Sequence, residues 1–260
     1  EAAGSWLLFT DADTTHQSCS ISGAISCAVE RKIDFLTLAP ETESRGFWEK
    51  TVQPLAVGSL ALWFDAVRVN GPDARCTLAN GQFILVKKEV YDRVGGNAAV
   101  RDQVVEDVEL AKVVKKAGYK VRFLNGTRFY STRMYSCLRE IRIGWTRIFT
   151  YLFDKKPLPI LTKILYFFFF SIVPYLLLAL EIGLGLVGHP AFDPTLLALS
   201  ATACLWIFAL RFIGNRLVRC DGRYAVFHPL GSAVMIWILL CCLGRIFLKR
   251  PSVWRGDLYR

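Results

Sequence analysis

The distribution of apolar residues divides the chain into two regions. Up to about residue 163, short apolar runs alternate with stretches of helical periodicity, which is typical of an α/β domain. From Ile164 onward, long runs of Leu, Ile, Phe and Val contain hardly a carboxylate. Three segments there carry no charged residue for 17, 17 and 21 positions, namely 164–180, 194–210 and 224–244. Each approaches the roughly 20 residues that a helix needs to cross a bilayer, so we predict a membrane protein.

This pattern predicts two domains, residues 1–158 and residues 159–260. The apolar segments of the second domain extend over 164–188, 194–213 and 224–244, and a basic C-terminal tail follows them. A buried core helix is the alternative for such segments, but residues 165–173 show no polar face at all. We expect Pro174 to kink the first of these helices.

The first region has the alternating elements of an α/β fold. Strands are expected over 6–9, 35–38, 83–86 and 120–124, and helices over 15–31, 45–66, 102–117 and 135–153. The apolar stripe of residues 45–66 suits either a core-facing or a membrane-surface helix. Residues 135–153 combine Arg with aromatic side chains just before the first apolar segment, which suits a helix at the bilayer interface.

Charge and cysteine usage narrow the class of partner. The chain has 260 residues with 32 Lys and Arg against 22 Asp and Glu, a net charge of +10. Nine of the basic residues lie between Arg211 and Arg260, beside the apolar runs, which indicates membrane headgroups rather than nucleic acid. The eight cysteines include no Cys-x-x-Cys and indicate reduced thiols. Because the chain begins without Met in an apparent strand, we expect a fragment whose start is missing.

Two acidic motifs are candidates for chemistry. Asp11 and Asp13 follow the first strand, and ligands bind outside the carboxyl ends of strands in open α/β sheets. Two such carboxylates can hold Mg²⁺ or Mn²⁺ against a diphosphate, although an ordinary turn is the alternative. Glu106 and Asp107 open a predicted helix, where acids also stabilise the helix dipole. A functional interpretation needs this second site to face the first and to take a proton from a hydroxyl. His16 lies one turn from Asp13, so contact with the metal or phosphate is one interpretation, but we favour a position on the surface of the helix over 15–31.

Four short motifs follow one another along the first region. They are W-L-L-F-T-D-A-D-T-x-H over 6–16, N-G-Q-F over 80–83 with Gly95 and Gly96, E-D-V-E-L-A over 106–111, and R-x-x-R-x-G-W over 139–145. In this order and spacing they resemble a membrane-integrated family 2 glycosyltransferase. The apolar segments and the closing W-R-G-D-L-Y over 254–259 are similar to bacterial members that glycosylate lipids such as carotenoids or hopanoids.

The resemblance implies a partial GT-A (Rossmann-like) domain followed by transmembrane helices. It implies an inverting mechanism with a nucleotide-sugar donor, expected to be a UDP-sugar, and a lipid acceptor. By resemblance, Asp11 and Asp13 contact the metal, Mg²⁺ or Mn²⁺, and the donor diphosphate. Asp107 is then the general base, and Glu106 shapes the acceptor site. In the family, the strands that hold the nucleotide base and ribose precede the first of these motifs, and we expect the missing start of the protein to supply them.

Four further residues take roles from the same resemblance. Gly81 and Gln82 line the pocket near the sugar, where a missing side chain allows close approach. Arg142 and Trp145 correspond to the family's Gln/Arg-x-x-Arg-Trp element, which helps to hold diphosphate and acceptor. The spacing differs here, because Ile143 and Gly144 separate the arginine from the tryptophan.

The loop charges predict the orientation. Residues 188–195 contain no Lys or Arg, whereas residues 211–223 contain four Arg, so the second loop and the catalytic domain are expected on the cytoplasmic side of the cell (inner) membrane. We expect residues 224–244 to enter and return, or to lie in the interface, because the basic tail follows them.

Other functions remain open. A processive polysaccharide synthase is the alternative within the enzyme class, although three apolar segments are few for a polymer channel. A membrane-tethered binding module without turnover is the alternative from another class. Metal-dependent nucleotidyl transfer would also use paired carboxylates, but it accounts neither for the region around Trp145 nor for the apolar segments.

Overall fold

A computed structural model describes residues 3–248, 252–254 and 257–259 of the protein. The contacts between residues form two compact units. The sheet unit consists mainly of residues 3–43 and 59–134, and the helical unit mainly of residues 44–58 and 135–248. The basic tail residues at 249–250, 255 and 260 and part of the closing motif over 254–259 lie outside the described residues.

The main sheet of the sheet unit has four strands in the order β1 (Trp6–Thr10), β5 (Phe83–Lys87), β3 (Phe35–Ala39) and β6 (Val121–Asn125). All four strands were predicted from the apolar pattern, and the structure confirms them. Strand β5 is antiparallel to β1 and β3, while β3 and β6 are parallel. The carboxyl ends of β1, β3 and β6 therefore share one edge with the amino end of β5.

A second, smaller sheet consists of β2 (Thr14–His16), β7 (Tyr130–Thr132) and β4 (Glu41–Thr42). Strands β2 and β4 come just after β1 and β3 along the chain. The predicted helix over 15–31 is therefore wrong at its start, because helix α1 spans Ser20–Glu30. The reason is long-range pairing, since Thr14 lies opposite Thr132 in the antiparallel ladder of β2 and β7. β-Branched threonines also suit a strand better than a helix.

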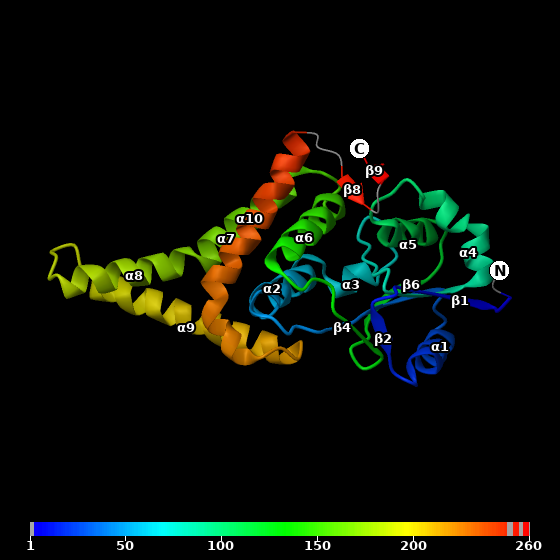
Figure 1. Ribbon diagram of the computed structural model, residues 1–260, viewed down its shortest axis with the longest axis horizontal. Helices are drawn as coiled ribbons and strands as arrows, with labels where there is room; N and C mark the ends of the chain where they lie inside the picture. Colours follow the sequence, from blue (N-terminus) through cyan, green and yellow to red (C-terminus); the bar gives the residue numbers. More distant parts are fainter. Residues whose placement is uncertain (1–2, 249–251, 255–256, 260) are drawn as a thin grey trace. The chain divides into compact units, whose positions relative to one another are not determined.

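Helices cover both faces of the four-stranded sheet, with α1 on one side and α4 (Lys88–Arg93) and α5 (Glu106–Lys116) on the other (Figure 1). Ala24 and Ala28 of α1 pack into a buried cluster with Leu36, Phe83 and Leu85. The predicted helix over 102–117 begins only at Glu106, because residues 101–104 form turns. It ends where Gly118 takes the left-handed conformation (φ +86°).

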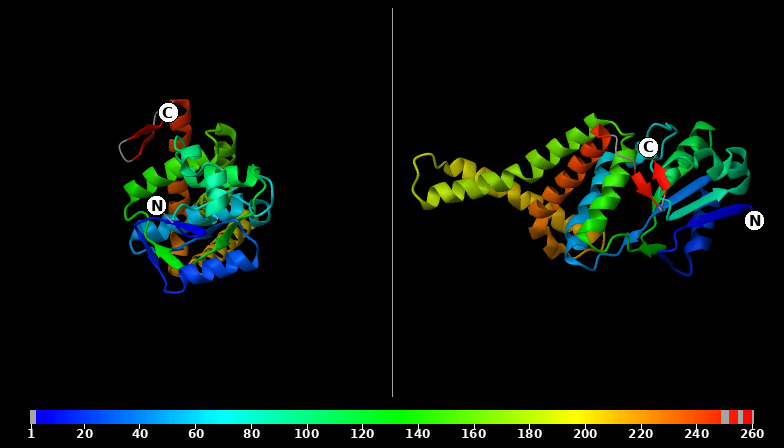
Figure 2. Two further views of the ribbon diagram at one scale, coloured as in Figure 1. Left: turned by 90° about the vertical axis from the view of Figure 1, so that its right-hand side faces the viewer. Right: turned by 45° about the horizontal axis from the view of Figure 1, so that its top comes forward.

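The helical unit contains the apolar segments. Its elements are the first part of α2 (Phe47–Trp63), α6 (Leu138–Leu152), α7 (Pro157–Ser171), α8 (Val173–Leu186), α9 (Pro194–Leu217), the short helix η2 (Gly222–Phe227) and α10 (His228–Phe247). Helix α9 returns beside α8, and α10 runs along α7 and α6 (Figures 1 and 2). Helices α7 and α8 break at Ile172, two residues before Pro174, as the sequence predicts.

Three stretches are long and apolar enough to cross a membrane: Pro157–Leu186, Pro194–Leu217 and Gly222–Phe247. Their most apolar windows have mean hydropathies of 2.1, 2.0 and 2.1. Of the third window 39% is buried inside the protein, against 17% in each of the other two. The third stretch is therefore the one most enclosed by protein, because α10 packs against both α6 and α7.

Candidate active site

The shared edge of the main sheet collects most of the residues that the sequence singled out. Asp11 and Asp13 lie exposed in the turn after β1, and Gly81 and Gln82 directly precede β5. The Thr14 hydroxyl donates a hydrogen bond of 2.7 Å to the Asp11 carbonyl oxygen, which fixes the turn. The edge therefore brings together motifs that lie about 70 residues apart in the sequence.

Asp107 joins this edge through a direct hydrogen bond. The backbone N–H of Gly81 donates to Asp107 Oδ2 at 2.8 Å, and the backbone N–H of Val108 donates to Oδ1 at 2.8 Å. Each carboxylate oxygen keeps capacity for a further hydrogen bond, because an ionised carboxylate has about four acceptor positions. The loop before β5 thus meets the first turn of α5, as a second acidic site requires.

Burial changes the acidity of Asp107. Desolvation raises its pKa to about 6, against the opposing effect of the Val108 and Gly81 hydrogen bonds, and the negative charge of Glu106 raises it further. Glu106 itself is exposed in the same first turn. A carboxylate with a pKa near the working pH is suited to accept a proton in a reaction.

A chain of side-chain hydrogen bonds continues from Gly81 toward the turn that holds Asp13. The amide Nδ2 of Asn80 donates to Gln82 Oε1 at 3.2 Å, and Gln82 Nε2 donates to the Thr132 hydroxyl at 3.3 Å. Thr132 in turn lies 3.5 Å from the Asp13 carbonyl oxygen. Gln82 is buried, so it acts from within the edge.

Tyr130 is a member of this edge that the motifs do not reveal. Its hydroxyl donates to the Leu38 carbonyl oxygen at 2.6 Å and accepts from Asn80 Nδ2 at 3.1 Å. Burial raises the pKa of Tyr130 above its ordinary value, and the negative charge of Asp11 adds to the shift. No local pattern marks Tyr130, because the contact with Leu38 spans 92 residues.

His16 lies in β2 and not on a helix surface, so that prediction is wrong. Its ring stacks on Tyr130 with centroids 5.6 Å apart, and Nε2 lies 2.8 Å from the Thr10 hydroxyl and 3.0 Å from the Thr14 hydroxyl. The ring therefore braces both sides of the turn that carries Asp11 and Asp13. The strand pairing described above is what moves His16 from the predicted helix into this position.

The comparison with known families bears directly on this edge. Residues 60–260 match the family described as Glycosyl transferase family 21. The chain belongs to this family. The match includes Gly81, Gln82, Glu106 and Asp107, while Asp11 and Asp13 precede the matched residues. None of the curated proteins matches the chain.

Membership confirms the predicted class, glycosyl transfer, at a coarser level than the resemblance suggested. The family is number 21, which is a different family from the family 2 of the resemblance. A glycosyltransferase needs a sugar donor and an acceptor. The three long apolar helices in addition support a membrane protein.

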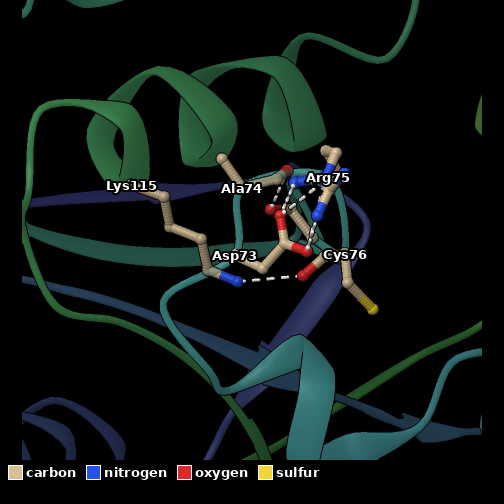
Figure 3. A network of polar contacts seen from close by, with 6 residues as sticks. Asp73, Ala74, Arg75, Cys76 and Lys115 are labelled. Carbon is tan, nitrogen blue, oxygen red and sulfur yellow. Dashed lines mark hydrogen bonds and ion pairs between the residues drawn. The ribbon is translucent and has the colours of Figure 1, made fainter.

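A buried lysine holds the loop of this glycosyltransferase that leads to Asn80. Lys115 of α5 is 6% exposed, and its ammonium group donates to the carbonyl oxygens of Val69 at 2.5 Å and Cys76 at 3.0 Å. Figure 3 shows the Cys76 contact beside the turn in which Asp73 accepts hydrogen bonds from Arg75. Burial lowers the pKa of Lys115. One helix thus carries Asp107 and anchors the segment before Gly81.

The acidic turn carries two side chains of the type that can bind a divalent metal ion. Asp11 and Asp13 offer the hard oxygen atoms that Mg²⁺ and Mn²⁺ prefer. Within the described parts of the chain, no group of three or more His, Cys, Asp and Glu side chains could hold a metal. Mg²⁺ is usually bound by one or two carboxylates together with substrate phosphates. A metal at this turn would therefore need oxygen ligands from another molecule in addition to the two carboxylates.

Arg142 and Trp145 belong to α6 in the helical unit. Trp145 is 2% exposed, donates from Nε1 to Gln53 Oε1 at 2.7 Å and stacks on Phe149. The Arg142 guanidinium lies over the ring of Trp237, 5.1 Å from its centroid. Within this unit both residues tie α6 to its neighbours α2 and α10.

One of the two extra residues in the Arg142–Trp145 motif, Gly144, has a packing role. The ring of Tyr135 lies against Gly144, so closely that a Cβ at that position would overlap it. Gly144 therefore leaves the space that this ring occupies on α6.

Proposed function

We propose that this protein is an inverting glycosyltransferase that moves a sugar from a nucleotide-sugar donor, a UDP-sugar, to a hydroxyl group of a membrane lipid. The observation that supports the proposal most directly is the Asp107 carboxylate. It is partly buried at the edge that also carries Asp11 and Asp13, it is oriented by two backbone N–H groups, and its pKa is raised to about 6.

In this proposal Asp107 is the general base. It removes the proton from the acceptor hydroxyl, whose oxygen attacks the anomeric carbon of the donor sugar. The bond between that carbon and the diphosphate oxygen breaks, and the nucleoside diphosphate leaves with the electron pair. Attack opposite the leaving group inverts the anomeric configuration. Glu106 shapes the acceptor side, while Gly81 and Gln82 line the sugar pocket.

Asp11 and Asp13 would hold Mg²⁺ or Mn²⁺ together with the donor diphosphate. When bound, the metal would supply positive charge against the leaving diphosphate. His16 keeps the acidic turn in place, because its ring contacts the hydroxyl groups of Thr10 and Thr14 on either side of the turn. Arg142 and Trp145 assist donor and acceptor binding, with Trp145 acting as a positioning residue because its ring is buried against Gln53.

The three membrane-length apolar helices in the same chain support a lipid acceptor. A hydroxyl group can enter the site of such an enzyme while its apolar tail stays in the bilayer. The resemblance of the sequence motifs favours a carotenoid or hopanoid type of acceptor.

We place the sheet unit on the cytoplasmic side of the cell membrane. Residues 188–195 carry no Lys or Arg, whereas four Arg lie in residues 211–223. An impermeant thiol reagent tests this on intact cells, with the exposed Cys19 and Cys137 changed to Ser. Ala191→Cys, between α8 and α9, should be labelled from outside and Lys156→Cys should not; the reverse result would contradict the orientation.

The test of function is transfer of labelled sugar. Membranes from cells that express the protein are given a panel of nucleotide sugars with Mg²⁺ or Mn²⁺, and the lipid extract is analysed. We expect a labelled lipid with one donor, a loss of rate on the order of a hundredfold or more in Asp107→Asn, and no loss in Asp102→Asn, an exposed carboxylate five residues upstream.

The other outcomes separate the alternatives. Label that appears in a polymer instead of the lipid extract would indicate a polysaccharide synthase. Binding of a donor without any transfer, in a folded protein, would indicate a non-catalytic module. Chelation of divalent metal should abolish transfer, and activity that persists under EDTA would contradict the role of Asp11 and Asp13.

A further inference from the structure

The helical unit contains a polar pocket at the end of α9. The pocket has a volume of about 650 Å³. Its lining includes three arginines, Arg216, Arg219 and Arg223, besides Phe212, Asp221 and Gly222. All of these residues lie between positions 212 and 223, where the chain leaves a membrane-length helix and turns into η2.

The charges of this pocket are not balanced. Arg223 is already paired, because its Nε and Nη2 atoms donate to the Asp221 carboxylate at 2.9 to 3.2 Å. Among the described residues that line the pocket, Asp221 is the one carboxylate. The side chain of Arg216 is exposed, and its guanidinium group makes no hydrogen bond or ion pair with any residue that the structure describes. The pocket therefore carries net positive charge with at least one guanidinium group available.

The four arginines of residues 211–223 do not share one role. Arg211 is 8% exposed, and its Nη2 donates to the Thr51 carbonyl oxygen at 3.0 Å within the helical unit. Arg211 has a structural role and does not line the pocket.

A charge bias for membrane orientation would be satisfied by Lys or Arg anywhere in the loop. This stretch contains no Lys, and three of its Arg residues line one pocket.

The face of α9 that enters the pocket changes from apolar to basic along its length. Phe208, Phe212 and Arg216 follow one another at intervals of four residues, so they lie on one face of the helix. Arg219 comes just after the end of the helix, where its backbone is left-handed (φ +56°). Both phenylalanines are exposed, at 38% and 39%. The ring of Phe212 also packs against Gly222, where an added Cβ would lie 2.6 Å from the ring. Phe212 thus forms the boundary between the apolar face and the pocket.

We propose that this pocket binds the phosphate of an anionic phospholipid headgroup. Planar guanidinium groups pair with phosphate oxygens through two parallel hydrogen bonds, which a lysine does not match. Basic pockets beside transmembrane helices are the usual binding sites for such headgroups. The acyl chains then lie along Phe208 and Phe212, and the phosphate lies at Arg216 and Arg219. This site is separate from the acidic edge of the sheet unit in its residues and in the charge of its ligand contacts.

The test uses purified protein in neutral detergent, with thermal unfolding as the readout. Phosphatidylglycerol should raise the unfolding temperature, and phosphatidylcholine should not. In Arg216→Gln the phosphatidylglycerol concentration for half of the effect should rise about fivefold, which corresponds to the loss of one basic contact near a membrane surface. Arg216→Lys should give an intermediate rise. Lys156→Gln removes the same charge just before α7 and should leave the response unchanged.

Several results would overturn the proposal. These are an equal loss in Lys156→Gln, an unchanged response in Arg216→Gln, and an equal rise with millimolar inorganic phosphate, which would point to a soluble phosphate ligand. A second measurement does not depend on unfolding: mass spectrometry of co-purified lipid should show less phosphatidylglycerol relative to zwitterionic lipid in Arg216→Gln. The Arg216→Gln variant should fold, because the side chain of Arg216 is exposed and makes no hydrogen bond or ion pair with the residues that the structure describes.

Discussion

The backbone N–H of Gly81 donates a hydrogen bond of 2.8 Å to Oδ2 of Asp107, across 26 residues of sequence. This bond ties the loop before β5 to the first turn of α5. It also orients the carboxylate that we propose as the general base. The contact between Gly81 and Asp107 therefore affects both the orientation and the pKa of the Asp107 carboxyl group.

The rate of sugar transfer should depend on pH through Asp107. A general base must be ionised, and burial raises the pKa of Asp107 to about 6. We therefore expect the rate to rise about tenfold per pH unit below 6 and to level off above it. Asp102→Asn should keep this profile. A rate that stays constant between pH 5 and pH 7 would argue against Asp107 as the base.

The stability of the protein should also depend on pH through Asp107, but it should fall with rising pH where the transfer rate rises. The pKa of Asp107 is higher in the folded protein, about 6, than its ordinary value of 3.8, so the folded state binds more protons between these values. Stability therefore falls as the pH rises from about 4 to about 6. Asp107→Asn should lack this part of the fall. The measurement is the unfolding temperature of both proteins across that range, and parallel curves would contradict the buried carboxylate.

Gly81→Ala should separate folding from catalysis. A Cβ at this position would lie 3.5 Å from Cβ and Oδ2 of Asp107, which is ordinary contact, and the φ of Gly81 is not left-handed. The variant should therefore fold with little change in unfolding temperature. The added methyl group stands beside the proposed base, so we expect transfer to slow on the order of tenfold to a hundredfold. Gly58→Ala, which has open space around it, is the control and should transfer normally.

Lys115→Met should destabilise the sheet unit without removing its chemistry. The substitution leaves the buried carbonyl oxygen of Val69 and the partly buried one of Cys76 without their donor, which should cost about 1–3 kcal/mol in the free energy of unfolding. Lys112→Met on the same helix breaks a more superficial pair with Glu109 and should cost less than about 1 kcal/mol. Chemical denaturation measures both. Equal costs would show that the Lys115 contacts are not the anchor.

Trp145 and Gln53 should show coupled effects on stability. Trp145→Phe removes the indole N–H and leaves Gln53 Oε1 buried without its donor, at a cost of about 1–3 kcal/mol. Replacing both residues, with Gln53→Leu as the second change, should cost less than the sum of the two single changes. Thermal unfolding in detergent gives the comparison. Additive effects would mean that the hydrogen bond does not hold α6 to α2.

The sequence by itself determined the elements whose signal is local. Strands β1, β3, β5 and β6 are short apolar runs, and the membrane-length helices are long ones, so their positions follow from composition over a few residues. The break before Pro174 follows from the chemistry of one residue. Glu106 and Asp107 were also correctly placed in the first turn of a helix, because acids accumulate there.

Tertiary structure alone decided the rest, because the deciding contacts are distant in sequence. Thr14–His16 became a strand by pairing with Tyr130–Thr132, which overrode the helix expected over 15–31. Tyr130 lies at the edge because its hydroxyl group donates to the Leu38 carbonyl oxygen. Gly81 contacts Asp107 at the end of a loop that Lys115 anchors. A local sequence pattern indicates only the propensity for a helix or a strand. The positions of these residues depend on hydrogen bonds whose donor and acceptor come together only after the chain has folded.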